Sequence, residues 1–512
     1  METNGTLGRH LVATEEIKPE FLIFKDKPIV LGPKVDTISA EIQEDVCVGC
    51  YSSFRPESEN GSIKPKVPCP HCDLPLCSEA CSQQYFHRNF ECRLIRDSEN
   101  APYSLGGIRT EILQNLIYLR CILISQMDQK LWSGLTDMAS NSEIRTENVH
   151  LDKTKEVYDL LQKILTNVNN PEFLQVDKSD VHTIIGVHET NAVEVKLAPN
   201  VELTVLYPLF SIMEHSCFPN VKYYFVPANS KDQFLEVYVR AATKLKKGEH
   251  LAISYTNILW STQKRREHLK RSKYLWCRCV RCMDPTELDT NFSTILCPSC
   301  KKSYALPFQR IGVKENEKED MHWKCLATTC GKICEAWQVK RMDLKMAELV
   351  TRVGNSIGSS KEMLSKMEEL VHPQYYMAFV VNHSLIQMYG RDLFSGKDKG
   401  DLEEKLKICN ELLNTIKKLD PGMARLNIYA AVIYFEMHSA ILAMAGGEND
   451  DDFHVLRKNV ETVHLARLYL SKCIDCFEYE LFDLPEKKLK TLASKKMEYL
   501  NLILKHGAKN RR

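Results

Sequence analysis

The sequence predicts a multidomain α+β protein whose β structure is split by a zinc module and a helical insert, and whose C-terminal third is helical. Three observations lead to this fold class. The chain has 512 residues, which is too long for a single hydrophobic core. Seventeen of its 20 cysteines precede residue 340, mostly in closely spaced pairs. Beyond residue 340 the sequence changes to long helical patterns with few breaks.

Strand-like runs lie at both ends of the first half of the chain, with helical runs between them. Runs bounded by turn residues and rich in β-branched or aromatic side chains predict strands. They cover 11–13, 21–24, 28–31, 202–206, 221–226, 235–239 and 251–255. Apolar residues at helical spacing predict helices over 108–124 and 154–165. The predicted β structure is therefore interrupted.

The C-terminal region predicts a series of antiparallel helices. They cover 342–353, 361–371, 374–389, 402–419, 422–444, 455–479 and 487–505. Pro373, Pro421 and Pro485 punctuate three of the joints, and 446–450 reads as a turn. Such a series favours a helical-repeat arm or lid. No clean repeat of about 34 residues, the tetratricopeptide period, is present.

Charge and composition narrow the classes of partner and compartment. Lysine plus arginine (68) almost balances aspartate plus glutamate (67), for a formal charge of +1. This balance does not predict nucleic acid as the main partner. Residues 1–10 are polar, and no run approaches the about 18 apolar residues that span a bilayer. We therefore expect a cytosolic or nuclear protein without a membrane partner, in which clustered cysteines bind metal rather than form disulfides.

The first cysteine cluster predicts two zinc sites. Paired thiolates one turn apart suit zinc because both sulfurs reach one ion from a single knuckle, at about 2.3 Å each. Eight ligand-type residues, enough for two tetrahedral ions, lie in this stretch: Cys47, Cys50, Cys69, Cys72, Cys77, Cys81, His87 and Cys92.

Two further groups of cysteines follow. Cys277, Cys279 and Cys282 stand close together and need one more ligand to complete a tetrahedral site. A later group resembles a zinc ribbon in spacing: Cys297, Cys300, Cys325 and Cys330, with Cys334 an alternative to Cys330. The sequence thus predicts three zinc ions, and a fourth if the ribbon binds one.

A series of short motifs runs along the chain in a fixed order: Gly8 to Thr14, the finger at 47–92, Glu189-Thr190-Asn191-Ala192, Leu206-Tyr207-Pro208, His215-Ser216-Cys217-Phe218-Pro219-Asn220, Gly248 to Tyr255, and the cysteines at 277–282. This order resembles the SET and MYND domain-containing (Smyd) proteins, most closely the arthropod SmydA group. The resemblance implies transfer of a methyl group from S-adenosylmethionine to a lysine of a protein substrate.

The resemblance also implies a division of the chain. It places the N-terminal part of the SET domain at 1–46, the MYND-type finger at 47–92, a helical insert at 93–180 and the SET core at 181–257. The post-SET zinc module then covers 258–284, the ribbon-like module 285–340 and a TPR-like helical domain 341–512.

Functional residues are carried over from the resemblance motif by motif. Tyr255 is the implied catalytic tyrosine, and Tyr274 the nearest match to the second aromatic of the lysine channel. The implied cofactor-binding residues are Gly8, Arg9, His10, Asn191, Glu214 and His215, with Tyr255 beside them. Cys217 is implied as the fourth ligand of the post-SET zinc.

The same resemblance implies an interleaved pairing within the finger. One ion takes Cys47, Cys50, Cys77 and Cys81, and the other takes Cys69, Cys72, His87 and Cys92. Relatives place the histidine four residues before the last cysteine. His87 stands five residues before Cys92, and Arg88 takes the expected place.

Three departures bear on the pocket. His10 replaces the second glycine of a Gly-x-Gly motif, where backbone approaches the cofactor. Glu214 replaces an asparagine before His215, and Lys273 holds the place of the second channel aromatic. These departures define an alternative: a catalytically weak or inactive scaffold whose finger binds proline-rich partners, in a role such as transcriptional repression. In either case we expect a monomer.

Overall fold

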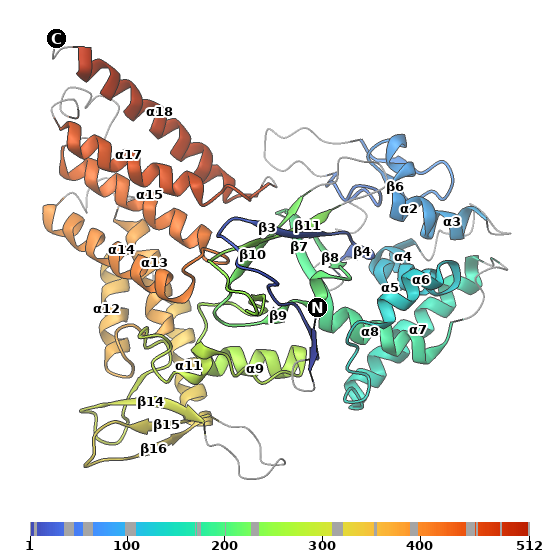
Figure 1. The fold of residues 1–512 in the computed structure, drawn as a ribbon, viewed down its shortest axis with the longest axis horizontal. Helices are drawn as coiled ribbons and strands as arrows, with labels where there is room; N and C mark the ends of the chain where they lie inside the picture. Colours follow the sequence, from blue (N-terminus) through green and yellow to red (C-terminus); the bar gives the residue numbers. More distant parts are fainter. Residues whose placement is uncertain are drawn as a thin grey trace.

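The computed structural model describes residues 2–4, 8–34, 46–54, 65–97, 109–168, 170, 176–199, 201–226, 235–309, 321–352, 356–389, 398–446, 456, 459–481 and 484–509. In Figure 1 the strands within residues 22–33 and 193–241 lie at the centre of the molecule, and the strands of residues 304–335 form a separate sheet at the lower left. The C-terminal helices lie on one side of the central strands, and the finger with the helical insert lies on the other.

Two small sheets form the central β structure, and both join the start of the chain to residues beyond 190. Strand β3 (Leu22–Asp26) pairs with β11 (Glu236–Ala241), which pairs with β10 (Val221–Val226). Strand β4 (Val30–Pro33) pairs with β8 (Val201–Leu206), which pairs with β7 (Val193–Ala198). The predicted split α+β fold is confirmed.

Two shorter pairs complete the centre. Strand β1 (Glu2–Asn4) pairs with β2 (Gly8–His10). Strand β9 (Glu214–His215) pairs in parallel with β12 (Ala252–Ile253). Because β9 and β12 each carry a motif singled out from the sequence, their pairing brings both motifs to one place.

The inserted segment consists of the finger and a helical layer. The finger contains β5 (Val67–Pro68), β6 (Pro75–Leu76), η1 (Glu79–Gln83), α2 (Tyr85–Asn89) and α3 (Glu91–Arg96). The helical layer contains α4 (Arg109–Gln114), α5 (Leu116–Met127), α6 (Gln129–Thr136), α7 (Asn148–Val168) and α8 (Lys178–Asn191). Helix α5 is buried from Leu116 to Ile124 and lies against β4, where Ile117 packs on Gly32.

Helix α9 (Thr262–Lys273) and the short α10 (Val280–Met283) lead into a four-stranded antiparallel sheet. Its strands are β13 (Ile295–Leu296), β14 (Tyr304–Gln309), β15 (Met321–Cys325) and β16 (Ile333–Glu335). The helices that follow are α11 (Ala336–Arg352), α12 (Ile357–Glu368), α13 (Tyr376–Met388), α14 (Lys399–Leu419), α15 (Asn427–Met444), α17 (Val460–Asp475) and α18 (Lys487–Lys509).

Several predicted boundaries are wrong. Residues 11–13 contribute only a single bridge, Val12 to His250, rather than a strand. The helix predicted over 108–124 breaks at Asn115, and the strand predicted over 251–255 shortens to Ala252–Ile253. The helix predicted from residue 422 begins at Asn427, because a buried aspartate caps the loop before it. Residues 108, 353, 447–450, 455, 457 and 458 of the predicted elements lie outside the described residues.

The expectation that no apolar run approaches the length of a membrane span is also corrected. Helix α15 is 18 residues long and apolar enough, by length and composition, to cross a membrane. In the structure it packs against α13, α14 and α17. Its apolar character therefore agrees with the core helix of a helical domain.

Candidate active site and zinc centres

The eight ligand-type residues of the finger gather into two groups. Cys47, Cys50, Cys77 and Cys81 form one group, and Cys69, Cys72, His87 and Cys92 form the other. Within each group the candidate ligand atoms all lie within 4.8 Å of one another. The grouping is the interleaved pairing that the sequence motifs implied, and either set of donors could hold zinc.

The unusual spacing of the histidine has a local cause. Helix α2 ends at Asn89 and α3 begins at Glu91, so the helical phase is broken at Phe90, whose φ and ψ are −111° and −98°. This break places His87, rather than Arg88, in the cysteine group: its Nε2 lies 3.4 Å from Cys69 Sγ.

A buried ion pair joins this finger site to the central β structure. His87 Nδ1 donates to Glu91 Oε1 at 2.9 Å, and Arg120 donates to both Glu91 oxygens at 2.6 and 2.8 Å. Arg120 also donates to Leu31 O at 2.7 Å and to Tyr51 Oη at 2.5 Å. A carboxylate behind a metal-ligating histidine fixes its ring orientation. This contact could not be predicted from the sequence, since Arg120 is a lone charge within a mostly apolar helix.

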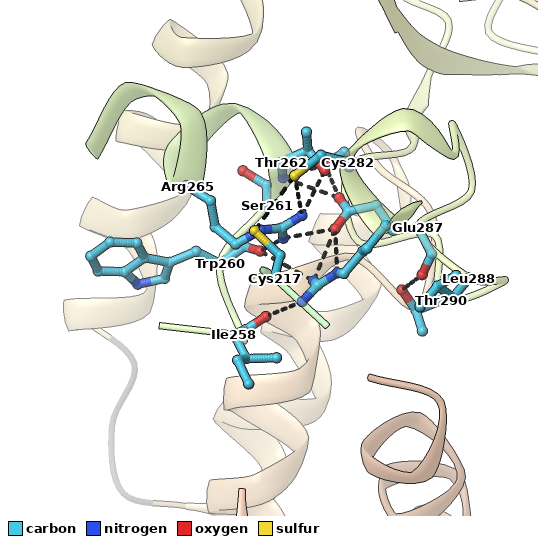
Figure 2. Close-up of polar contacts among 12 residues, drawn as sticks. Cys217, Ile258, Trp260, Ser261, Thr262, Arg265, Cys282, Glu287, Leu288 and Thr290 are labelled. Atoms are coloured by element: carbon cyan, nitrogen blue, oxygen red, sulfur yellow. Dashed lines mark hydrogen bonds and ion pairs between the residues drawn. The ribbon is translucent and has the colours of Figure 1, made fainter. Parts of the chain in front are cut away.

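The third group consists of Cys217, Cys277, Cys279 and Cys282. Cys217 Sγ lies 3.9 Å from Cys277 Sγ and 3.5 Å from Cys282 Sγ. Figure 2 shows Arg265 of α9 reaching this group, where its Nη2 donates to Cys282 Sγ at 3.5 Å. A zinc ion held by four thiolates carries a net negative charge, so an adjacent guanidinium stabilises the site.

Glu287 is the centre of the network drawn in Figure 2. Its carboxylate accepts from Arg265 Nη1 at 2.8 Å, Arg281 Nε at 3.0 Å and the Thr262 backbone N–H at 3.1 Å, and also from Ser293 Oγ. All three charged side chains are fully buried. Although burial alone would raise the pKa of Glu287, the two guanidinium groups lower it to about 2.

The fourth group consists of Cys297, Cys300, Cys325 and Cys330. Cys297 lies 3.8 Å from Cys330, and Cys300 lies 3.8 Å from Cys325, between sulfur atoms. Cys334 instead lies on β16, buried in the core that the ribbon shares with the C-terminal helices. The structure therefore places Cys330, and not Cys334, in this group.

We expect purified protein to contain four zinc ions per chain, because each group supplies four converging donors. Elemental analysis of the intact protein measures this number. Cys297→Ser should lower it to three, whereas the matched control Cys334→Ser should leave it at four. A count of two or fewer in folded protein, or an equal effect of the two variants, would contradict the ligand assignment.

A large cleft of 2610 Å³ contains most of the other predicted site residues. Arg9, Asn191, Glu214, His215, Tyr255, Lys273 and Tyr274 all line it. The parallel pairing of β9 with β12 places Glu214 opposite Ala252 and His215 opposite Ile253, just ahead of Tyr255. Residues that are 40 positions apart in the chain thus share one wall.

Tyr255 is held at both its backbone and its side chain. Its N–H donates to His215 Nδ1 at 3.0 Å, and its hydroxyl donates to Met213 O. Because His215 Nδ1 accepts, its Nε2 carries the proton and faces Cys217 Sγ at 3.3 Å. Burial raises the pKa of Tyr255, and the nearby Glu214 and Tyr223 raise it further. The hydroxyl therefore stays protonated, and its position is tied to the third cysteine group.

His10 does not line the cleft. Its side chain is 2% exposed and stacks on His250, with ring centroids 4.7 Å apart and 10° between the planes. His250 Nδ1 in turn donates to Glu214 Oε2 at 2.7 Å. His10 thus lies behind His250 and supports the residue that orients Glu214. Gly8 pairs with Asn4 and is likewise absent from the described cleft wall.

Asn191, Lys273 and Tyr274 are engaged with the helical insert. Asn191 Nδ2 donates to Ala139 O and Val187 O, both at 2.8 Å. Lys273 Nζ donates to the Glu189 and Thr190 carbonyls at 2.9 and 2.7 Å, and burial lowers its pKa to about 8.

Tyr274 ends α9 in the left-handed conformation, with φ 52°. Its hydroxyl oxygen lies 3.2 Å from His150 Nε2 of α7. Leu275 and Tyr255 both pack against the cluster of Leu269 and the buried cysteines of the third group.

Residues of the C-terminal region and of β10, which are not among the site residues predicted from the sequence, complete the cleft. Tyr223 lies against Phe210, with ring centroids 4.8 Å apart, and both line the cleft with Tyr255. Arg425, between α14 and α15, and Tyr479, between α17 and α18, line it from the C-terminal region. Aromatic spacing along β10 was the available signal for Tyr223, but nothing in the local sequence of Arg425 indicated its partner.

Comparisons with known proteins relate the chain to proteins with a SET domain. The family model of the SET domain matches residues 8–256. SmydA-8 isoform A of Drosophila melanogaster, a SET domain-containing protein, is 27% identical over 378 residues, covering 72% of each chain. The histone-lysine N-methyltransferase SMYD3 of Mus musculus is 32% identical over 290 residues, covering 55% of this chain and 60% of its own.

Proposed function

Because the chain is a SET-domain protein related to the Smyd proteins, we propose that it transfers a methyl group from S-adenosylmethionine to a lysine side chain of a protein substrate. One observation carries the proposal. The Tyr255 hydroxyl is fixed within a cleft that Glu214 and His215 also line, beside the parallel pair of β9 and β12.

The polar groups of the cleft fit the cofactor in chemical kind. Glu214 uses Oε2 for His250, which leaves Oε1 to accept from the cofactor's ammonium group. Asn191 uses both Nδ2 hydrogens within the protein, which leaves Oδ1 as an acceptor. His10, which lies behind His250, does not fill the space. When bound, the cofactor supplies an electrophilic methyl group on a sulfonium.

The protein's own part in the reaction is to position a neutral amine. The Tyr255 proton is directed to Met213 O, so the oxygen lone pairs of the hydroxyl can accept an N–H of the substrate amine and orient the nitrogen. Aromatic walls from Phe210 and Tyr223 replace water around that amine, which favours its uncharged form. Positioning of this kind is worth roughly 7 to 11 kcal/mol of barrier.

The zinc groups have a structural part in this proposal. The third group holds Cys217, and His215 connects Cys217 to the Tyr255 backbone. Its four donors are all cysteines, as in structural zinc sites, and methyl transfer needs no zinc-bound water. We further propose that the protein acts in the cytosol or nucleus and that it is a monomer. Light scattering of the purified protein measures its molar mass and so tests the monomeric state.

We expect S-adenosylmethionine to bind and to stabilise the protein by about 2.7 kcal/mol at a hundredfold excess over its dissociation constant. Glu214→Gln should weaken binding by roughly 1.5 to 3 kcal/mol, because it removes a charged acceptor. Calorimetry on zinc-replete protein measures both effects.

His10→Gly is the matched test of the pocket. It removes a ring that supports His250, so we expect it to give no gain in cofactor affinity. Absence of binding heat in the wild type, together with binding by His10→Gly, would mean that the pocket is closed and would favour the scaffold alternative.

A further inference from the structure

Arg425 lies in the loop between α14 and α15, and this loop is held both by hydrogen bonds within it and by contact with the central sheet. The carboxylate of Asp420, which is fully buried, accepts from the backbone N–H groups of Ala424, Arg425 and Leu426 at 2.9, 2.7 and 2.8 Å. Gly422 packs on Ala242 at the end of β11, where an added Cβ would lie 2.5 Å from Ala242 O. The loop between α14 and α15 therefore holds its place on the central sheet.

The guanidinium of Arg425 has one partner and several unused donors. Its Nη1 donates to Tyr223 Oη at 2.7 Å, and its centre lies 5.4 Å from the centroid of that ring. The side chain is exposed, and no carboxylate of the described residues lies within ion-pair distance of it. Arginine has five N–H donors in a planar fork, so most of this fork is available to a ligand.

Tyr223 adds a second donor beside the fork. Its hydroxyl oxygen accepts from Arg425, which leaves its own proton for another acceptor. The ring of Tyr223 packs on Phe210, three residues before the carbonyl that fixes the Tyr255 hydroxyl. Two converging donors, one of them cationic, therefore lie in the cleft that also contains Tyr255.

We propose that Arg425 and Tyr223 form a carboxylate-binding subsite of the methyl-transfer cleft, with the C-terminal domain supplying the charge. A guanidinium fork binds a carboxylate through two parallel N–H bonds and discriminates against a neutral amide. The carboxylate has two sources: an acidic side chain beside the target lysine, or the carboxylate of the cofactor. The first would make this subsite a determinant of substrate choice. The proposal rests on the proposed function for its location but not for its binding chemistry.

Paired synthetic peptides test the subsite. The two peptides of a pair share one central lysine and differ at a single position, where one has glutamate and the other glutamine. Across the pairs this position runs from four residues before the lysine to four residues after it. Fluorescence anisotropy measures binding, and mass spectrometry measures methylation with S-adenosylmethionine. If the carboxylate belongs to the substrate, we expect the protein to prefer glutamate over glutamine roughly tenfold at one or two of these positions. Arg425→Ala should abolish it, and Arg425→Lys should retain only part of it.

Two controls separate the outcomes. Tyr223→Phe should reduce the preference, while Arg467→Ala, which alters an exposed arginine of α17 outside the cleft, should leave it unchanged. If Arg425→Ala instead weakens S-adenosylmethionine binding, measured by calorimetry, the carboxylate is that of the cofactor. If neither ligand responds to Arg425→Ala in folded, zinc-replete protein, the subsite is refuted. Retention of the binding preference without any methylation would support the subsite and contradict the proposed function.

Discussion

Replacement of Glu287 by alanine is expected to destabilise the protein by about 3 to 5 kcal/mol and to loosen the third zinc site. The reason is that Arg265 and Arg281 are fully buried and share this one carboxylate. Without it, two positive charges remain in the interior, and Arg265, which donates to Cys282, loses its carboxylate partner. Thermal unfolding and zinc content per chain, measured on the same sample, check both parts of the prediction.

A surface ion pair of α9, the helix that carries Arg265, provides the control. Glu267 of α9 pairs with Lys340 at 3.1 Å, and both side chains are exposed, so Glu267→Ala should cost less than about 1 kcal/mol and leave zinc in place. Similar losses in the two variants would remove the special role of Glu287.

The stabilisation by Glu287 also has a defined pH window. The folded-state pKa lies below the ordinary 4.5, at about 2. The contribution is therefore fully present above pH 4.5 and is lost as the pH falls toward 2.

Tyr255→Phe is expected to lower the rate of methyl transfer by about a hundredfold while leaving folding, zinc content and cofactor affinity close to those of the wild type. The substitution keeps the ring and removes only the hydroxyl that Met213 O fixes. Misplacement of reacting groups by about 1 Å is enough for a loss of this size. Single-turnover kinetics isolates the chemical step from product release.

Tyr274→Phe is the matched variant for the second predicted aromatic. Its hydroxyl contacts His150 rather than the carbonyl that holds Tyr255. A loss equal to that of Tyr255→Phe would place Tyr274 at the reacting atoms, and unchanged turnover would remove it from the catalytic residues. Unchanged turnover in Tyr255→Phe itself would end the catalytic assignment of Tyr255.

The cysteine groups could be predicted because their information is local. Two thiolates separated by two residues predict a knuckle, and the order of motifs implied which knuckles share an ion. The choice between neighbouring candidate ligands was harder to predict, because it depends on the local backbone conformation. The break at Phe90 decides for His87 over Arg88. A turn in which Cys330 N–H donates to Ala327 O decides for Cys330 over Cys334.

The buried charges could not be predicted, because their partners are distant in sequence. Arg120 meets Glu91 from a helix that is otherwise apolar. Arg265 lies on a helix rich in lysine and arginine, where a charged residue reads as solvent-facing. Arg425 and Tyr223 are separated by 202 positions. Such pairs are set by tertiary packing, which leaves no periodic or spacing signal in one sequence.

The departures from the family motifs show the same limit. From the sequence, the ring of His10 could either obstruct the pocket or stack on it, and Lys273 could narrow the lysine channel. The structure instead stacks His10 behind His250 and directs Lys273 to the last carbonyls of α8. Whether such a residue obstructs the pocket depends on the direction of its side chain, and the identity of the residue does not fix that direction.

The most direct test of the central claim is transfer of a labelled methyl group from S-adenosylmethionine to a broad panel of proteins, with the modified residue identified by mass spectrometry. The account predicts label on lysine with wild-type protein, and a loss of about a hundredfold with Tyr255→Phe. Wild-type protein that contains its zinc and binds the cofactor, yet labels no lysine on any protein of the panel, would contradict it.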